Sequence, residues 1–373
     1  MKFSDVIGQI ELKTRLIQTV KENRISHAQL FAGTEGCGNL AIAIAYAQYI
    51  CCENRTETDS CGTCKSCVKY NKLVHPDFHF VFPVVNTSAH PKAVSDDYIF
   101  EWRTAVLNNP YMNLNYWIEL ISSENKQGGI FERESNEIVR KLNLKTYESD
   151  YKIMIIWMPE KIHLVAANKL LKIIEEPPSK TLFLLVSENP GQILSTILSR
   201  CQYVKVPPIE ESEMRKILKD KGLQGNKINE MVKYGAGNYF KIDELINKQE
   251  DENQFFNLFA SMMRFCYARK IPELFKWLDE ISNLGRERQK NFLQSSLRVI
   301  RDNFTLNITN FSPAHLNHEE ATFSEKFHTF ITQENVYSLT DEFNKAIYHI
   351  ESNGNAKIIF LDMTLKVLKL IKP

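Results

Sequence analysis

Short apolar runs alternate with helix-like segments through roughly the first 210 residues, and this alternation constrains the fold more than any other feature. Three continuous apolar runs are typical of strands buried on both faces. A fourth run follows a cysteine-rich stretch, and a fifth is edge-like. The five runs are "AQLFAG" (28–33), "HPDFHFVFP" (75–83), "YKIMIIWMP" (151–159), "TLFLLVSENP" (181–190) and "QYVKVPPI" (202–209). Because parallel strands need a crossover between them, usually a helix, the pattern predicts a parallel α/β sheet.

The chain changes character after Pro207 and Pro208. Two short amphipathic segments follow, and from about residue 250 to the end the sequence reads as helix. A length of 373 residues also exceeds one ordinary domain. We therefore predict an α/β domain over 1–208, a small helical domain over 209–248 and a helical C-terminal domain over 249–373.

The stretch from about 86 to 129 interrupts this plan, because it is irregular, polar and aromatic. We interpret it as an insertion that carries one or two short helices. Its sequence indicates no role.

Charge and hydropathy exclude several classes of protein. Lys and Arg number 46 against 45 Asp and Glu, so no overall basic surface points to nucleic-acid binding by the chain alone. The sequence shows neither an apolar core of signal-peptide length near its start nor 18 uninterrupted apolar residues anywhere. We expect a soluble cytoplasmic protein with no membrane partner.

Five of the eight cysteines lie between Cys51 and Cys67. In a reducing compartment such clustering favours a metal over disulfides. The spacing C-x8-C-x2-C-x2-C suits Zn²⁺, which prefers four tetrahedral thiolates, and a closed set of four leaves no position for catalysis. The predicted ligands of this structural zinc are Cys52, Cys61, Cys64 and Cys67.

Spacing alone leaves alternatives to this ligand set. Cys51 could replace Cys52, and the cluster could instead be a redox pair or a group of unrelated buried thiols. Cys37, Cys201 and Cys266 are isolated, and we interpret them as packing residues.

The stretch "FAGTEGCGNLAIAIAYAQ" (31–48) begins like a phosphate-binding loop, with glycines at Gly33, Gly36 and Gly38. In a working loop, backbone N–H groups cradle the phosphates, a Lys reaches the β- and γ-phosphates, and a Ser or Thr holds Mg²⁺. Here Asn39 and Leu40 stand in the last two places, and they offer neither a cation nor a hydroxyl. On this loop alone, a chance run of glycines is an equally good interpretation.

A second requirement of ATP hydrolysis is an acidic pair at the end of a buried strand, which holds the metal and orients water. The strand "KIMII" instead runs into Trp157, Met158 and Pro159, and Glu160 is the first acid after it. Both halves of a metal site are therefore missing. We expect this chain neither to hydrolyse ATP nor to bind ATP and Mg²⁺.

The segment 168–201, "NKLLKIIEEPPSKTLFLLVSENPGQILSTILSRC", resembles the block "NALLKxLEEPP…ILSRC" of bacterial sliding-clamp loaders of the AAA+ class. With "FSDVIGQ" (3–9), "HAQLFAG" (27–33) and the cysteine insert, the chain is similar to the delta-prime branch of the DNA polymerase III clamp loader. The resemblance covers about 1–85 and 130–210. Beyond about 250 it rests on helical character and length, and 86–129 is an insertion relative to the family.

The resemblance implies an AAA+ domain, a small helical lid and an all-α collar. It also implies a stator in a five-subunit ring of delta, delta-prime and three gamma/tau ATPases, which opens the beta clamp and places it on primed DNA. Members of this branch typically have a degenerate phosphate loop and do not hydrolyse ATP. The resemblance favours Cys52 over Cys51 as first zinc ligand. It further implies a Ser-Arg-Cys motif at Ser199, Arg200 and Cys201, with Arg200 as an arginine finger onto ATP of the adjacent gamma/tau subunit.

Several positions depart from active relatives or stay open. The segment 6–9, "VIGQ", resembles one that packs on adenine, so retained nucleotide binding remains open. Phe240 and Lys241 stand near the place of a second sensor arginine. The acids of "EEPP" (175–178) read as a helix end and receive no catalytic role. Two other functions are alternatives to the stator role. The chain could be a gamma/tau-like ATPase with an atypical loop, or a zinc module that binds DNA by itself.

Overall fold

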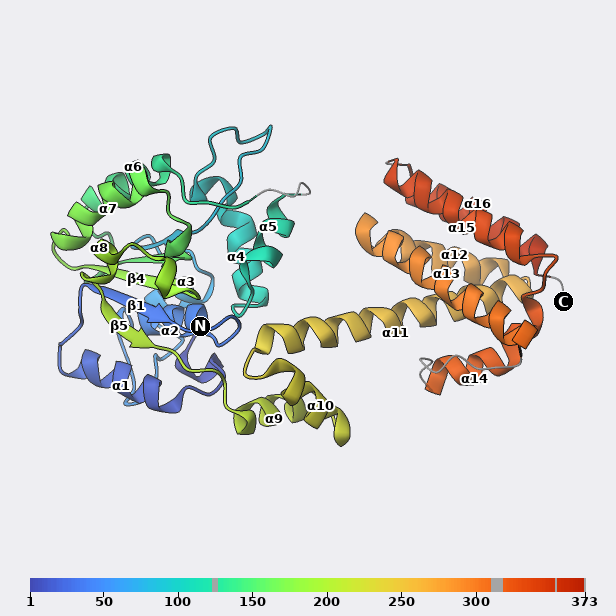
Figure 1. Ribbon diagram of the computed structural model, residues 1–373, viewed down its shortest axis with the longest axis horizontal. Coiled ribbons are helices and arrows are strands. Elements are labelled where there is room, and N and C mark those ends of the chain that lie inside the picture. Colours follow the sequence, from blue (N-terminus) through green and yellow to red (C-terminus); the bar gives the residue numbers. More distant parts are fainter. Residues whose placement is uncertain (123–126, 310–317, 353, 372–373) are drawn as a thin grey trace. The chain divides into compact units, whose positions relative to one another are not determined.

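A computed structural model of the chain describes residues 1–122, 127–309, 318–352 and 354–371. It divides into two compact units, Met1–Glu244 and Leu245–Pro373, and Figure 1 labels their elements. The predicted insertion and the predicted C-terminal domain both include residues outside the described ranges.

The first unit contains a five-stranded sheet in the order β2-β3-β4-β1-β5, and every neighbouring pair is parallel. The prediction of a parallel α/β sheet is therefore confirmed. The edge character predicted for the last run is also confirmed, because β5 pairs with β1 alone. The strands are β1 (Ala28–Ala32), β2 (Phe78–Val81), β3 (Lys152–Trp157), β4 (Thr181–Ser187) and β5 (Gln202–Lys205).

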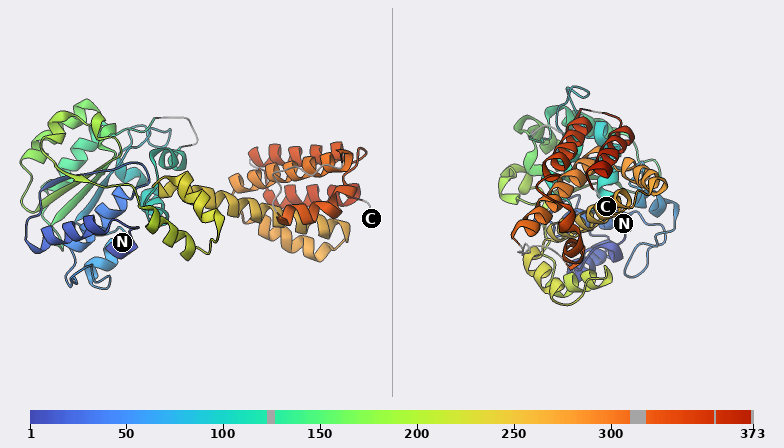
Figure 2. Two further views of the ribbon diagram at one scale, coloured as in Figure 1. Left: turned by 60° about the horizontal axis from the view of Figure 1, so that its bottom comes forward. Right: turned by 90° about the vertical axis from the view of Figure 1, so that its right-hand side faces the viewer.

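Helices cover both faces of this sheet (Figure 2). Helix α2 contacts β1, β3 and β4 on one face, and every one of its residues is buried. The apolar sides of α6, α7 and α8 pack on the other face. These apolar stripes are what make the helices amphipathic and fix their orientation on the sheet. The helices of the first unit are α1 (Ile10–Lys21), α2 (Asn39–Ile50), α3 (Lys65–Asn71), α4 (Ile99–Asn108), α5 (Leu114–Ile121), α6 (Glu132–Asn143), α7 (Leu164–Glu175), α8 (Ser195–Leu198), α9 (Glu211–Asp220) and α10 (Asn226–Gly235).

The insertion contains two short helices, α4 and α5, in agreement with its sequence. An aromatic cluster attaches it to the sheet. Trp102 stacks on Phe82 just beyond β2, with ring centroids 4.2 Å apart and planes 14° apart. Trp117 and Trp157 each lie 5.1 Å from Trp102, and the Trp117 indole donates a hydrogen bond to the Pro83 carbonyl at 2.8 Å. Buried aromatic pairs of this kind stabilise beyond their area alone, so the insertion is an integral part of the first unit.

A buried carboxyl group also joins the insertion to α6. Glu134 is 2% exposed, and its Oε2 accepts a hydrogen bond from the Ser95 backbone N–H at 2.7 Å. Burial raises the pKa of Glu134 to about 7, although the Ser95 N–H and the Lys141 ammonium oppose the shift.

All the regular elements in the described part of the second unit are helices. Its helices are the later part of α11 (Tyr239–Tyr267), then α12 (Ile271–Ser282), α13 (Arg286–Thr309), α14 (His318–Phe327), α15 (Val336–Glu351) and α16 (Ala356–Leu370). Phe259, Phe292, Phe343 and Phe360 are fully buried in one shared core. None of the helices described for the whole chain combines the length and apolar character needed to cross a membrane.

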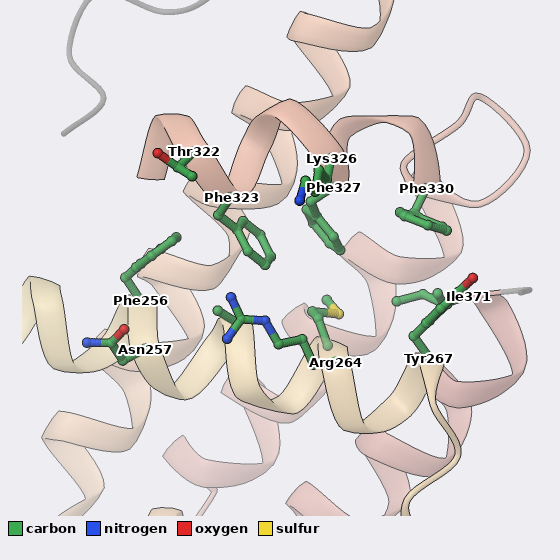
Figure 3. A pocket seen from close by; sticks show the side chains of 12 residues that line it. Phe256, Asn257, Arg264, Tyr267, Thr322, Phe323, Lys326, Phe327, Phe330 and Ile371 are labelled. Atoms are coloured by element: carbon green, nitrogen blue, oxygen red, sulfur yellow. The ribbon is translucent and has the colours of Figure 1, made fainter. Parts of the chain in front are cut away.

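Figure 3 shows a pocket of about 580 Å³ in the second unit, lined mainly by apolar side chains of α11 and α14. Arg264 and Lys326 are its charged members. The Arg264 guanidinium carbon lies 5.8 Å from the centre of the Phe323 ring, within the range of a cation–π contact. No residue that the sequence predicts for a site lines this pocket.

The raised pKa of Glu134 predicts a pH dependence of stability. Between about pH 4.5 and 7 the folded state keeps a proton that the unfolded state has lost, so the free energy of unfolding falls as pH rises through this window. Glu134→Gln removes that loss, which is on the order of 3 kcal/mol. We expect the free energy of unfolding of the variant to change less between pH 5 and pH 8 than that of the wild type. The stability of the variant relative to wild type should therefore be higher at pH 8 than at pH 5. Denaturant unfolding followed by tryptophan fluorescence measures this.

The exposed Glu132 on the same helix supplies the control, since Glu132→Gln should keep the wild-type pH profile. Superimposable pH profiles of wild type and Glu134→Gln would contradict the prediction.

Candidate functional site

The glycine loop keeps the strand–loop–helix geometry expected of it. It connects β1 to α2, and the Gly33 N–H donates to the Ser187 carbonyl of β4 at 3.1 Å. Gly38 caps the N-terminus of α2 with φ of 90°, a left-handed conformation that glycine adopts without strain. The loop therefore lies at the carboxyl ends of the central strands. Parallel sheets bind ligands at this end of their strands.

Asn39 and Leu40 are used for packing rather than presented to a ligand. Both are buried, and Leu40 is only 1% exposed. The Asn39 amide donates to the Ser187 carbonyl at 3.2 Å, while its Oδ1 accepts from the Leu40 N–H at 2.8 Å. The side chain of Asn39 thus ties the helix N-terminus to β4.

Two side chains that the sequence analysis missed lie directly against the loop. A Cβ atom at Gly38 would lie 2.7 Å from Cε1 of Tyr111, and one at Gly36 would overlap Oδ1 of Asn238. Tyr111 comes from the insertion and Asn238 from the end of the segment that carries α9 and α10. No motif in the sequence marks either residue, because each contact joins distant parts of the chain.

Two buried apolar residues stand at the end of β3, and the first acid after them hydrogen-bonds to the segment after β4. Trp157 and Met158 are buried, and the Glu160 carboxylate accepts hydrogen bonds from the Glu188 and Asn189 N–H groups, each at 3.1 Å. Burial, with the nearby carboxylates of Glu35 and Glu160, raises the pKa of Glu188 to about 8. Glu160 therefore stabilises the turn after β4.

The cysteine cluster assembles as a possible metal centre. One Sγ atom from each of Cys52, Cys61, Cys64 and Cys67 lies within 4.8 Å of all the others. Backbone N–H groups of Cys61, Cys64 and Cys67 donate to the sulfurs of Cys52, Cys61 and Cys64 at 3.3, 3.3 and 3.4 Å. Donors of this kind stabilise thiolates, and the N–H groups of Cys64 and Thr63 lower the pKa of Cys61 to about 6. Four gathered cysteine sulfurs suit a tetrahedral metal such as zinc, which binds cysteine as thiolate.

Cys51 lies outside this group. Its Sγ is 4.0 Å from the Tyr151 carbonyl oxygen, whereas Cys52 is among the four gathered sulfurs. Cys37 and Cys266 are buried, and Cys201 is half-buried.

Arg200 lies at the other end of the sheet from the glycine loop. The parallel register pairs Gln29 with Gln202 and Ala32 with Lys205, so the loop follows the carboxyl end of β1 whereas Arg200 precedes the amino end of β5. A strand of four residues spans about 13 Å. The structure therefore does not bring Arg200 together with the chain's own glycine loop.

A carboxylate and a carbonyl hold the Arg200 side chain. Its Nε and Nη2 donate to Oε2 of Glu175 at 3.1 and 2.9 Å, and its Nη1 donates to the Thr196 carbonyl at 2.8 Å. These bonds use three of the five N–H groups of a guanidinium. Ser199 is exposed, and burial raises the pKa of the Cys201 thiol to about 11. Glu175, to which the sequence assigned no role, is thus the partner of Arg200.

The cysteine geometry predicts bound zinc. We expect the purified wild-type chain to hold one zinc ion, and Cys64→Ser to lose it and to melt at a lower temperature, because structural zinc contributes folding free energy directly. Atomic absorption and thermal melts measure both effects.

Cys51→Ser is the matched control and should keep its zinc, since its sulfur lies outside the cluster. Equal loss of zinc from Cys51→Ser and Cys64→Ser would contradict the predicted ligand set.

Comparisons with known proteins all point to subunits of DNA polymerase III. The family described as "DNA polymerase III, delta subunit" matches residues 8–210, which is more than half of the chain. The chain is 29% identical to DNA polymerase III subunit delta' of Bacillus subtilis over 196 residues, 52% of this chain and 46% of that protein. It is 26% identical to DNA polymerase III subunit tau/gamma of Haemophilus influenzae over 215 residues, 57% of this chain and 25% of that protein.

The matched regions span about half or less of these curated relatives. Among solved structures, a DNA polymerase III gamma subunit-related protein of Thermotoga maritima aligns with 97% of this chain and 99% of its own. Its TM-score is 0.37 and its identity 14%, so this likeness carries no argument about function. The family match over residues 8–210 is sufficient by itself: the chain belongs to the DNA polymerase III delta-subunit family.

Proposed function

We propose that the chain is the delta-prime, or stator, subunit of the DNA polymerase III clamp loader. It hydrolyses no ATP itself and supplies Arg200 to ATP bound by a neighbouring gamma/tau subunit. Its direct partners are the delta and gamma/tau subunits. Through the complex it acts on the beta sliding clamp and on primed DNA during replication.

The observation that carries this proposal is that the glycine loop and Arg200 lie at opposite ends of the sheet. At the carboxyl end, Asn39 and Leu40 are buried in place of a phosphate-gripping Lys and a metal-binding hydroxyl. At the amino end, Arg200 lies too far along the strands to serve its own loop. An arginine in this place acts on a nucleotide only if another subunit brings that nucleotide to it.

The chemistry of Arg200 suits that task. A guanidinium stays charged at any physiological pH and presents planar N–H donors that match phosphate oxygens. Glu175 and the Thr196 carbonyl fix its plane and leave two N–H groups for a partner's γ-phosphate. Because Glu175 accepts two of the guanidinium hydrogen bonds, we propose that this carboxylate positions Arg200 as the finger.

The remaining parts take supporting roles in this proposal. Zinc held by the four cysteines stabilises the fold and takes no part in catalysis. Residues 1–208 form the AAA+ domain, 209–248 the lid and 249–373 the collar by which the chain joins the ring. ATP and Mg²⁺ are bound by the neighbouring subunit.

A gamma/tau-like ATPase with an atypical loop is the second candidate, favoured by the similarity to the Haemophilus influenzae tau/gamma subunit. The two candidates differ in the purified chain alone. Steady-state hydrolysis that depends on Asn39 and not on Arg200 would support the ATPase and contradict the stator.

The proposal predicts a specific effect of Arg200 in the reconstituted ring. Arg200→Ala should leave assembly intact and lower the clamp-dependent ATPase by at least about tenfold, since arginine fingers commonly contribute more than this. Single-turnover hydrolysis and size-exclusion chromatography measure the two effects.

Arg215 offers a matched control, because its side chain is 37% exposed against 31% for Arg200 and also pairs with a glutamate. Arg215→Ala should leave turnover unchanged. Normal turnover by an assembled Arg200→Ala ring would refute the finger.

The role of Glu175 is tested in the same ring. Glu175→Gln keeps the size of the side chain but removes the charge that holds Arg200, so we expect a lower kcat with little change in KM for ATP. Glu175→Asp should recover part of the loss. If Arg200→Ala lowers turnover and Glu175→Gln does not, the positioning role fails while the finger survives.

A further inference from the structure

The insertion reaches across the glycine loop to the residues that follow α10. The Asn109 amide donates to Oδ2 of Asp243 at 2.9 Å. The Tyr111 ring lies 5.0 Å from the ring of Tyr239, and the Tyr116 ring lies 5.7 Å from that of Phe240. Three insertion side chains thus contact the segment 239–243, which lies more than 120 residues further along the chain.

Tyr111 is the centre of these contacts. It is 6% exposed, its ring packs on Gly38, and its hydroxyl accepts a hydrogen bond from the Ile7 N–H at 2.8 Å. One side chain therefore touches the N-terminal segment, the glycine loop and the start of α11 together. Because a glycine loop at a helix N-terminus is where an anion would otherwise lie, Tyr111 covers the place of a phosphate.

The segment after α10 also contacts the loop directly. The Asn238 amide donates to Oε1 of Glu35 at 3.0 Å, and the Tyr239 N–H donates to the Gly36 carbonyl at 3.1 Å. Lys221, just beyond α9, pairs with Asp243 at 2.7 Å and lies 5.4 Å from the Tyr239 ring centre. Hydrogen bonds and ring contacts therefore link α9, the start of α11, the loop and the insertion into one network.

The same insertion also covers the end of β3. Trp102 packs on Trp157, which stands at the end of β3 where an active site would carry its metal-binding acid. Asn109 and Tyr111 each make a polar contact to a separate segment, from the Asn109 amide to Asp243 and from the Ile7 N–H to the Tyr111 hydroxyl. Other parts of the insertion contact α6 and the residues after β2, whereas Tyr111 lies against the glycine loop and Trp102 against the end of β3.

We propose that the insertion is an internal latch that takes the structural place of a nucleotide. Its latch residues, Asn109, Tyr111 and Tyr116, join the α/β part to the helical segment 209–244 through side chains of the chain itself. The conformation of residues 1–244 is then fixed without ATP and does not respond to it. This inference is independent of the role of Arg200.

Hydrogen exchange of the full-length chain tests the latch. Tyr111→Ala removes the central contact, so we expect amides of α9 and α10 (211–235) to exchange at least about tenfold faster. The melting temperature of the first unit should fall by about 6–12 °C. Exchange in the cysteine segment 52–71, which the latch does not touch, should stay at the wild-type rate.

Two milder variants keep the test decisive if Tyr111→Ala does not fold. Asn109→Ala and Tyr116→Ala each remove one contact at the edge of the latch and should speed exchange in 211–235 by a smaller factor. Phe100→Ala is the matched control, since Phe100 lies on α4 of the same insertion with 76% of its surface exposed. Wild-type exchange in 211–235 for both variants, or equal acceleration in 52–71, would overturn the latch.

A second arm uses ATP and Mg²⁺ as the probe. Millimolar concentrations should leave both the melting temperature and the exchange of the wild-type chain unchanged. A rise in melting temperature with protection of residues 33–40 would show that the loop is open to nucleotide and would also overturn the latch.

Discussion

The parallel register of β1 and β5 places the glycine loop and Arg200 at opposite ends of the sheet. Both strands run in one direction, so a residue after β1 and a residue before β5 must lie at opposite ends of the sheet. The glycine loop and Arg200 occupy these two positions. Under the proposed function, a single sheet can therefore close its own nucleotide site and still present a cation to a neighbouring subunit, because the two tasks share no side chain.

Burial of α2 explains how the loop keeps its shape although Asn39 and Leu40 follow its glycines. Every residue of this helix is buried, and it packs against three strands. Burial of this extent fixes the helix, and with it the loop that precedes it, through packing alone. The Asn39 amide adds a hydrogen bond to β4 at the point where a Lys would have reached outward. The glycine loop is held by the core on its inner side and by Tyr111 and Asn238 on its outer side.

The sequence predicted those features whose signal is local. Runs such as "KIMII" reveal a buried strand because neighbouring residues share one environment, and the cysteine spacing indicated a gathered thiolate set within 16 residues. The sequence could not predict the contact of Tyr111 with Gly38 or the ion pair of Arg200 with Glu175. The first joins residues 73 positions apart, and the second joins a helix end to a turn 25 positions later. Such pairs depend on how elements pack, and no periodicity records that.

The contact of Tyr111 with Gly38 also limits how the loop could be re-engineered. Replacing Asn39 by Lys and Leu40 by Thr would supply the residue types of an active loop, but both positions are buried. A lysine there would place a charge in the core, where an unpaired ion is strongly unfavourable. An active loop would therefore need changes in the insertion as well, because Tyr111 packs against Gly38 beside these two positions. If the proposed function holds, the aromatic side chains of the insertion would keep the chain from hydrolysing ATP even after the two loop residues were replaced.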